Sequence, residues 1–146
     1  MQSSEIKKRL MKDKSFIGCF PFDQLPSLPE KLPAKLIINT GASSTEGEHW
    51  VALLLKPKSC FYFDSFGIPI INHEIHKFLQ KKYRKVTFSS LCIQDYRSKK
   101  CGEFCIFFLK NVTNKQTYLL FLKRFSDANL LFNDTLLEYS NILNMF

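Results

Sequence analysis

The chain has 146 residues, of which 45% are hydrophobic and 14% are aromatic. This much apolar surface excludes a disordered chain, and the length predicts a single domain over residues 1–146. The net charge of +8 is compatible with binding a polyanion, and equally with a solvated face that keeps an apolar protein soluble.

Two further features bear on the cellular compartment. No apolar run approaches the roughly 18 to 20 residues needed to cross a membrane, and residues 1–9 resemble an exposed basic helix more than a signal sequence. The number of cysteines is odd, which favours free thiols over a disulfide framework. They are Cys19, Cys60, Cys92, Cys101 and Cys105. We therefore expect an intracellular protein without a membrane anchor.

The first half of the chain is predicted to form strands. The proline-rich residues 21–33 indicate an extended surface connection. Apolar patterns then predict strands at 35–40, 48–55 and 60–64, with a polar loop at 41–47 and a turn before the last strand. Both faces of 48–55 are apolar, which predicts a central strand covered on both sides.

The second half is predicted to be mainly helical. Helices are expected at 72–83, 101–112, 115–125 and 127–145, and a short strand at 86–89 leads to an extended segment reaching Gln94. The nearly continuous apolar run at 101–112 predicts a helix buried all round, and the last two helices are assigned to packing. The fold class is therefore α+β, with a central mixed β-sheet flanked by helices.

Polar residues at the ends of these elements match the chemistry of a thiol protease. Cys101 offers a nucleophile, His49 a base, Asp64 an orienting carboxylate, and Gln94 a donor to an oxyanion. Cys101 begins its predicted helix, where free backbone N–H groups and the helix dipole favour a thiolate. Each of these residues alone would carry a structural interpretation, so the prediction rests on the combination.

The predicted hairpin allows His49 and Asp64 to meet. If its turn centres between Pro57 and Lys58, Val51 faces Asp64 and His49 lies diagonally beside Asp64 on the same face. Diagonal neighbours lie about 7 to 8 Å apart at the backbone. An imidazole and a carboxylate can close most of that distance.

Five motifs in order resemble a known family. They are Ile37-Ile38-Asn39-Thr40, His49-Trp50, Phe63-Asp64-Ser65-Phe66-Gly67, Gln94 and Cys101-Gly102-Glu103-Phe104-Cys105. From about residue 16 to 112 they are similar to the adenain-like maturation proteases of adenoviruses, polinton-like elements and virophages, whose residue order the ubiquitin-like-protein (SUMO) proteases share. The resemblance implies an adenain-like, permuted papain-like cysteine protease fold.

The resemblance also implies roles. Cys101 would be the nucleophile, His49 the general base and later acid, and Asp64 the group that orients His49. Gln94 and the Cys101 N–H would stabilise the oxyanion. Trp50 and Gly102 would bind substrate, with Trp50 shaping a cleft for small residues; a core indole is an equally open interpretation of Trp50.

Substrates and surroundings follow from the same resemblance. It implies cleavage of viral structural precursor proteins after Gly-Gly or similar small residues, in the infected cell (virus factory or nucleus) and in the virion. We expect a monomer and no required cofactor. A DNA or peptide activator stays open, the DNA binding non-specifically through the basic clusters at 81–85 and 97–100.

Several other residues carry structural interpretations. Tyr83 stands at the distance before Gln94 where adenain has the cysteine that bonds its activating peptide, so a disulfide-tethered activator is not supported. Cys92 and Cys105 are expected to be buried. His73 and His76 lie three residues apart on a predicted helix but have no convincing third ligand, so no metal site is expected.

Two alternative functions remain. One is a protease that removes SUMO or another ubiquitin-like modifier, against which the small size argues. The other is an inactive binding protein or a basic nucleic-acid-binding protein. The intact Cys, His, Asp and Gln set argues against loss of turnover, because a binding protein has no physical need for all four.

Overall fold

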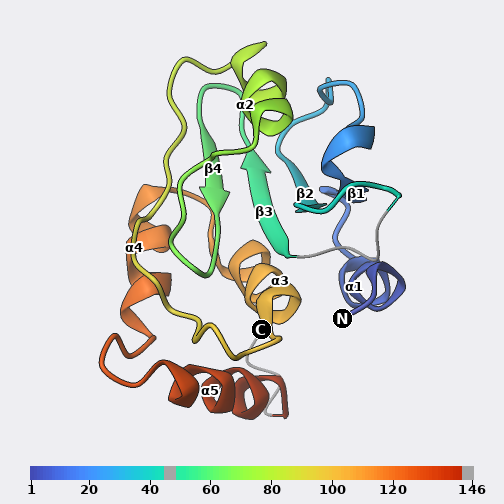
Figure 1. Cartoon of the computed structure of the whole chain (residues 1–146). Coiled ribbons are helices and arrows are strands. Elements are labelled where there is room, and N and C mark those ends of the chain that lie inside the picture. Colours follow the sequence, from blue (N-terminus) through green and yellow to red (C-terminus); the bar gives the residue numbers. More distant parts are fainter. Residues whose placement is uncertain (45–48, 143–146) are drawn as a thin grey trace.

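A single mixed sheet forms the centre of the computed structural model, which describes residues 1–44 and 49–142 (Figure 1). The strand order is β1-β2-β3-β4. The strands are β1 (Phe16–Pro21), β2 (Ala34–Asn39), β3 (Trp50–Leu55) and β4 (Cys60–Phe63). β1 runs parallel to β2, and the other pairs are antiparallel. The predicted mixed sheet is confirmed, and β3 is a central strand as expected.

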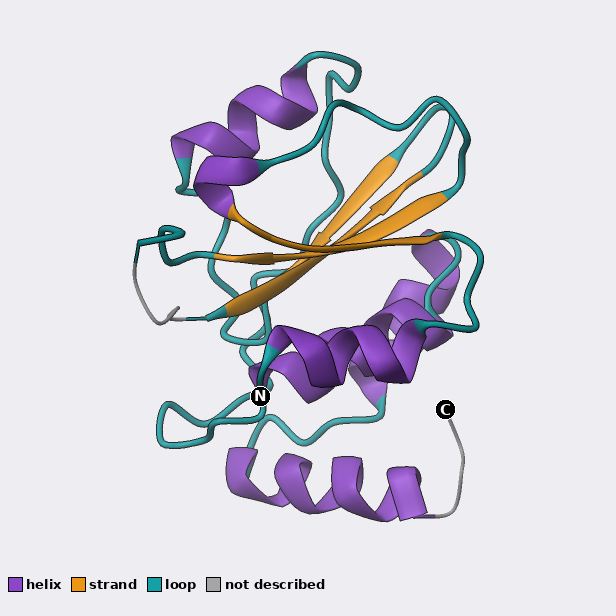
Figure 2. Cartoon of the chain, turned by 90° about the vertical axis from the view of Figure 1, so that its right-hand side faces the viewer, coloured by secondary structure: helices purple, strands orange, loops and turns teal. Residues whose placement is uncertain are grey.

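Helices cover both faces of the sheet. They are α1 (Ser3–Leu10), the short 3-10 helix η1 (Phe22–Gln24), α2 (His73–Gln80), α3 (Cys101–Asn111), α4 (Lys115–Lys123) and α5 (Leu130–Ile142). Figure 2 shows the sheet edge-on, with α2 on one side and α1, α3, α4 and α5 on the other. The α+β class is thus confirmed. In the described part of the chain no helix is long and apolar enough to span a membrane.

The larger core lies between the sheet and α3. Every residue of α3 from Phe104 to Leu109 is buried, as the apolar run predicts. Phe63 of β4 stacks on Phe108 at 4.8 Å between ring centroids, and Phe121 of α4 meets both rings edge-on. Aromatic pairs of this geometry stabilise by about 0.5 to 1.5 kcal/mol beyond area burial. This cluster holds α3 rigidly against the sheet.

The opposite core joins the sheet to α2 and to residues 21–33. Ile75, Phe78 and Leu79 of α2 are buried there. The proline-rich segment also packs against this core through partly buried apolar side chains, which are Phe22, Leu25, Leu28 and Leu32. It is therefore a covering layer, and not merely a surface connection.

Three elements differ from the expectations. β1 is absent from the predicted strands, because Gly18 introduces a register shift with φ of 139° that breaks the pattern of this edge strand. The strand expected at 86–89 is a single bridge between Phe61 and Thr87. The N-terminal helix is not wholly exposed, since Ile6 and Leu10 are buried.

The hairpin register is confirmed. Leu55 pairs with Cys60 and Ala52 with Phe63, a register whose next pair would place Val51 opposite Asp64. The Thr40 N–H donates to the His49 carbonyl at 2.8 Å, so the residue that follows β2 holds the backbone of His49 just before the start of β3. The expected loop at 41–47 and the strand start at Glu48 fall partly on residues 45–48, outside the described residues.

Candidate active site

Cys101 is the first residue of α3, at the rim of a cleft. The cleft has a volume of about 950 Å³. Its lining includes Met1, His49, Trp50, Gln94 and Cys101, which are far apart in the sequence. Lys100 precedes the helix without a side-chain cap, so its first N–H groups and the positive end of its dipole face this region.

His49 and Asp64 form a close pair beside Cys101. Nε2 of His49 lies 2.8 Å from Oδ1 of Asp64, and the side chains are only 14% and 6% exposed. The same Oδ1 atom accepts a hydrogen bond from the Phe66 N–H at 2.8 Å. The Phe66 ring stacks on the imidazole at 4.6 Å between centroids. The imidazole is thus held in position by a carboxylate at one edge and an aromatic ring on one face.

The thiol and the imidazole interact, and this interaction contributes to shifts in both pKa values. Burial alone would lower the pKa of His49, but the hydrogen bonds and charges of Asp64 and Cys101 raise it to about 9. Burial would raise the pKa of Cys101, yet the hydrogen bond and charge of His49 and the N–H groups of Trp50 and Gly102 bring it below the ordinary value. These opposite shifts favour a thiolate beside an imidazolium.

Gln94 reaches the same cleft from the segment that precedes α3. Its side chain is only 1% exposed, and the Ser65 hydroxyl donates to its carbonyl oxygen Oε1. Its amide nitrogen Nε2 donates to the Ser98 carbonyl at 3.0 Å and to the Ser98 hydroxyl at 3.3 Å. Because Oε1 accepts and Nε2 donates, these contacts determine which way the amide faces.

The turn after Asp64 holds the Gln94 segment. The Ser65 carbonyl accepts from the N–H groups of Ile93 and Gln94 at 2.9 and 3.1 Å. Gly67 has φ of 71°, and a Cβ placed there would lie 2.6 Å from the Ser90 carbonyl oxygen. Only glycine combines this left-handed backbone with so close an approach. The turn therefore fixes Asp64 and Gln94 relative to each other.

Trp50 and Gly102 lie together beside Met1. The Trp50 Nε1–H donates to the Met1 carbonyl at 3.1 Å, and the half-buried indole both lines the cleft and packs on the main core. A Cβ on Gly102 would lie 3.1 Å from the Met1 sulfur and 3.3 Å from Trp50 Cδ1. The position of Trp50 is compatible with either interpretation, and a side chain at Gly102 would press on Met1 and Trp50, which lie outside the helix.

The other singled-out residues have structural surroundings. Cys105 is fully buried, its thiol donates to the Trp50 carbonyl at 3.3 Å, and burial raises its pKa well above the ordinary value. Cys92 is only half-buried, against expectation, and bonds the Gln94 carbonyl at 3.2 Å. The buried Tyr83 hydroxyl donates to the Lys56 carbonyl at 2.6 Å.

His73 and His76 are exposed on α2. Within the described ranges no three His, Cys, Asp or Glu side chains gather as a metal site would require.

Sequence reasoning did not assign roles to Ser65, Phe66 or Ser98. Ser65 and Phe66 lie inside the quoted Asp64 motif, so their position next to the acid was a usable signal. Ser98 carried no such signal, because its hydroxyl meets Gln94 only through the path of the loop between Gln94 and α3.

A thiol at a helix N-terminus, near an imidazole that a carboxylate orients, is the arrangement that cysteine-dependent hydrolases use. Comparison with known proteins identifies a family of proteases. The sequence model of the adenovirus endoprotease family matches residues 16–124. The chain belongs to the adenovirus endoprotease family.

Individual relatives carry the name "Protease". That of Human adenovirus B serotype 3 is 32% identical over 130 residues, covering 73% of this chain and 60% of the relative. That of Human adenovirus A serotype 12 is 33% identical over 118 residues, covering 70% and 53%. The chain thus spans about half to three fifths of these relatives' length. Among solved structures, the ASFV pS273R protease matches 79% of this chain and 58% of its own, with 19% identity and a TM-score of 0.43.

Proposed function

We propose that this chain is a cysteine endopeptidase that processes viral precursor proteins. The observation that carries the proposal is the His49–Asp64 pair, 2.8 Å between Nε2 and Oδ1, whose histidine lines one cleft together with the first residue of α3, Cys101. Membership of a family whose relatives are named "Protease" supports the same activity. The pair supplies what a thiol nucleophile lacks at neutral pH, which is a nearby base that keeps the proton it takes.

The first half of the proposed reaction is acyl transfer to sulfur. The Cys101 thiolate attacks the scissile carbonyl carbon, and the carbonyl π electrons move to oxygen to form a tetrahedral oxyanion. As this intermediate collapses, the C–N bond breaks and the amine leaves with the proton that His49 held. The product is a thioester on Cys101. Asp64 keeps the imidazolium oriented and stabilises its charge throughout this step.

The second half returns the enzyme to its resting state. The now neutral His49 takes a proton from water as the water oxygen attacks the thioester carbonyl. The C–S bond then breaks, releasing the carboxylic acid product and the Cys101 thiolate beside protonated His49. No group other than water is consumed.

Gln94 and the Cys101 N–H are the proposed donors to the oxyanion. The Cys101 N–H is one of the free groups in the first turn of α3, where the helix dipole also favours negative charge. Gln94 lines the same cleft, and Ser65 and Ser98 hold its amide in one orientation. Removing one such donor typically costs about 10²- to 10³-fold in rate.

The substrates proposed are viral structural precursors cut after Gly-Gly or similar small residues. Met1 and Trp50 pack beside Gly102 and line the cleft together with Cys101, so bulky side chains already occupy space next to the nucleophile, which favours small substrate residues there. The relatives come from adenoviruses, which agrees with a place of action in the infected cell and the virion.

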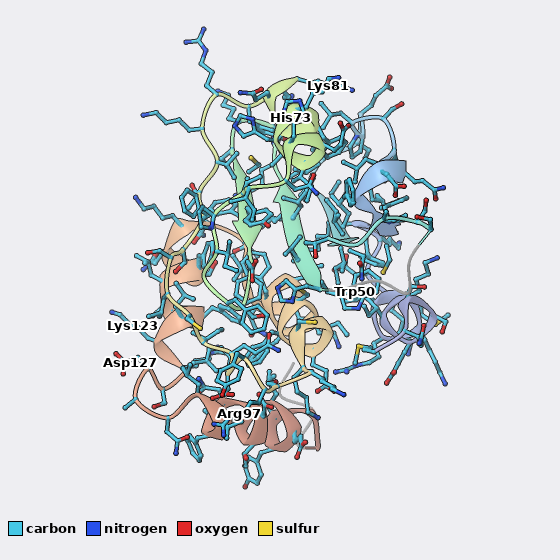
Figure 3. All side chains as sticks on the ribbon, viewed as in Figure 1. Trp50, His73, Lys81, Arg97, Lys123 and Asp127 are labelled. Carbon is cyan, nitrogen blue, oxygen red and sulfur yellow. The ribbon has the colours of Figure 1, made fainter. Side chains whose placement is uncertain are left out.

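Activation by DNA is also proposed, with the DNA bound at only one of the two basic clusters. Figure 3 places Lys81 and Arg97 at opposite ends of the protein, so the two basic clusters do not make one surface. In the second cluster Arg97 pairs with Asp95 at 2.9 Å, and Lys100 with Glu138 at 2.9 Å. The exposed cluster at 81–85 is the better candidate for a polyanion.

The proposed activity is tested with peptides that carry Gly-Gly at varied positions, with and without duplex DNA, using mass spectrometry to locate cuts. We expect cleavage after a small residue by the wild-type protein and none by Cys101→Ala. A SUMO-type conjugate included in the same assay separates endopeptidase from deconjugating activity. The absence of cleavage by the wild-type protein in every condition, as in Cys101→Ala, would contradict the proposal.

A further inference from the structure

The C-terminal helix α5 lies outside the residues that match the family. The match ends at residue 124, whereas α5 spans Leu130–Ile142. Figure 2 shows α5 beyond α3, on the side away from the sheet. Its sequence predicts packing only, yet its polar side chains contact the segment that carries Gln94.

Asn133 is the first of these contacts. It is 0% exposed, and its Nδ2 group donates to the carbonyls of Ile93 and Ser126, each at 2.8 Å. Its Oδ1 atom accepts from the Ser126 N–H at 2.8 Å. A buried amide with these groups bonded fixes the start of α5 against the residue that precedes Gln94, because leaving any of them unpaired would be costly.

Asp134 is the second contact, and it meets Ser98. The Ser98 hydroxyl donates to Asp134 Oδ1 at 3.0 Å, since an ionised carboxylate only accepts. The hydroxyl oxygen is then left to accept, and it does so from Gln94 Nε2 at 3.3 Å and from the Lys100 N–H at 3.2 Å. Asp134 therefore turns the Ser98 hydroxyl so that its oxygen can accept from Gln94 Nε2.

The chain continues through the amide to the turn after the acid. Gln94 accepts from the Ser65 hydroxyl at Oε1 and donates towards Ser98 from Nε2. Both acceptors of Nε2 belong to Ser98, so a single N–H shared between them would suffice, and a role in oxyanion binding requires the other N–H to face the cleft. Rotating the amide by half a turn would place its NH₂ group against the Ser65 hydroxyl, which donates, and its oxygen against the Ser98 carbonyl, which accepts.

We infer that α5 positions the oxyanion donor, with Asp134 acting through Ser98 to hold the Gln94 amide and Asn133 anchoring the helix to Ile93. This inference rests on the proposed function, in which Gln94 stabilises the oxyanion. Asp134 and Asn133 touch neither substrate nor the reacting atoms, so they are positioning residues. None of these bonds is made by the side chains of Cys101, His49 or Asp64.

Two probes of Cys101 separate these roles. Iodoacetamide alkylates the thiolate with loss of iodide and forms no oxyanion. A peptide aldehyde ending in glycine adds the thiolate to its carbonyl and forms a thiohemiacetal whose oxygen occupies the oxyanion position. A misplaced Gln94 therefore weakens aldehyde binding without slowing alkylation.

The experiment compares the full-length wild-type protein with Asp134→Ala, Asp134→Asn and Ser98→Ala. We expect Asp134→Ala and Ser98→Ala each to bind the aldehyde about 10-fold more weakly, a fraction of the loss caused by removing a donor outright. Asp134→Asn keeps an acceptor for Ser98 and should recover most of the affinity. A protein that carries both Asp134→Ala and Ser98→Ala should bind the aldehyde no more weakly than either single variant, because both substitutions interrupt the same chain of bonds.

Glu138→Gln is the matched control. Glu138 lies on the same helix and contacts the same loop, but through Lys100 at 2.9 Å and not through Ser98. The aldehyde affinity of the Glu138→Gln variant should therefore stay within twofold of the wild-type value. Alkylation rates and melting temperatures of all variants report on the thiolate and on folding.

The outcomes distinguish failure of the proposed function from failure of the positioning role of α5. Slow alkylation of Cys101 in the wild-type protein would overturn the proposed function itself. Fast alkylation together with wild-type aldehyde affinity in both Asp134→Ala and Ser98→Ala would overturn only the positioning role of α5. Aldehyde binding and alkylation falling in parallel would also overturn it, since that result indicates a structural role alone.

Discussion

Asp64 Oδ1 accepts two hydrogen bonds at 2.8 Å, one from His49 Nε2 and one from the Phe66 N–H. The two residues of the His–Asp pair are 15 positions apart, and the antiparallel register of β3 and β4 brings them together. With Nε2 bound to the carboxylate, Nδ1 is the nitrogen left for Cys101. The pair therefore fixes both the orientation of the imidazole and the atom that exchanges a proton with the thiol.

Asp64→Asn should lower the pKa of His49 from about 9 towards its ordinary value, because the charge of the carboxylate is lost. General acid–base catalysis contributes typically 10²- to 10⁴-fold, so we expect peptide cleavage to fall by at least about 10-fold. Unchanged kcat/KM in this variant would show that the carboxylate does not act through His49.

The pH profile of cleavage should be bell-shaped. Its acidic limb reports ionisation of Cys101, whose pKa lies below the ordinary thiol value. Its alkaline limb, near pH 9, reports loss of the His49 proton that the leaving amine needs. Alkylation needs only the thiolate, so its rate should rise with pH and show no alkaline fall. Asp64→Asn should move the alkaline limb of cleavage to lower pH.

Phe66→Ala should loosen the imidazole without removing its carboxylate. The ring stacks on His49 at 4.6 Å, and aromatic contacts of this kind contribute about 0.5 to 1.5 kcal/mol. We expect kcat/KM to fall roughly 3- to 10-fold by that figure, with a smaller loss in Phe66→Leu. Full activity in Phe66→Ala would mean that Asp64 holds the imidazole without help from the Phe66 ring.

Gly67→Ala should reduce both stability and activity. Its φ of 71° costs a residue with a side chain about 1 to 2 kcal/mol, and the added Cβ would lie 2.6 Å from the Ser90 carbonyl oxygen. Relief of that contact displaces the segment leading to Gln94. The measurements are the free energy of unfolding and kcat.

Gly18→Ala is the control for this substitution. Gly18 also has positive φ, 139°, but its Cβ would meet only the Phe20 ring at 3.2 Å. It should lose stability with little change in kcat. Equal kcat losses in the two variants would mean that the turn at Gly67 does not position Gln94.

The strands and the hairpin register were predictable because they depend on local patterns. The apolar faces of residues 48–55 and the length of the turn together place His49 beside Asp64. β1 was not predicted, since Gly18 breaks the alternation of a short edge strand. The packing of Ile6 and Leu10 was also missed, because the charged residues around them made the first helix look exposed.

The candidate residues were predictable from chemistry and spacing, whereas their supports were not. Cys101, His49, Asp64 and Gln94 are residue types that a thiol site requires, so their order was informative. Ser98 and Asp134 are common surface residue types 36 positions apart, and only the tertiary path of α5 brings them together. The sequence contains no local pattern that marks such a contact.

The central claim is that His49 activates Cys101, and it is tested most directly by iodoacetamide labelling of the native protein near neutral pH. Peptide mapping then measures the rate at each cysteine in the wild-type protein and in His49→Ala. We predict fast labelling of Cys101, much slower labelling in the variant, and slow labelling of the buried Cys60 and Cys105 in both. Labelling of Cys101 as slow as that of Cys105, or a rate that His49→Ala leaves unchanged, would contradict the claim.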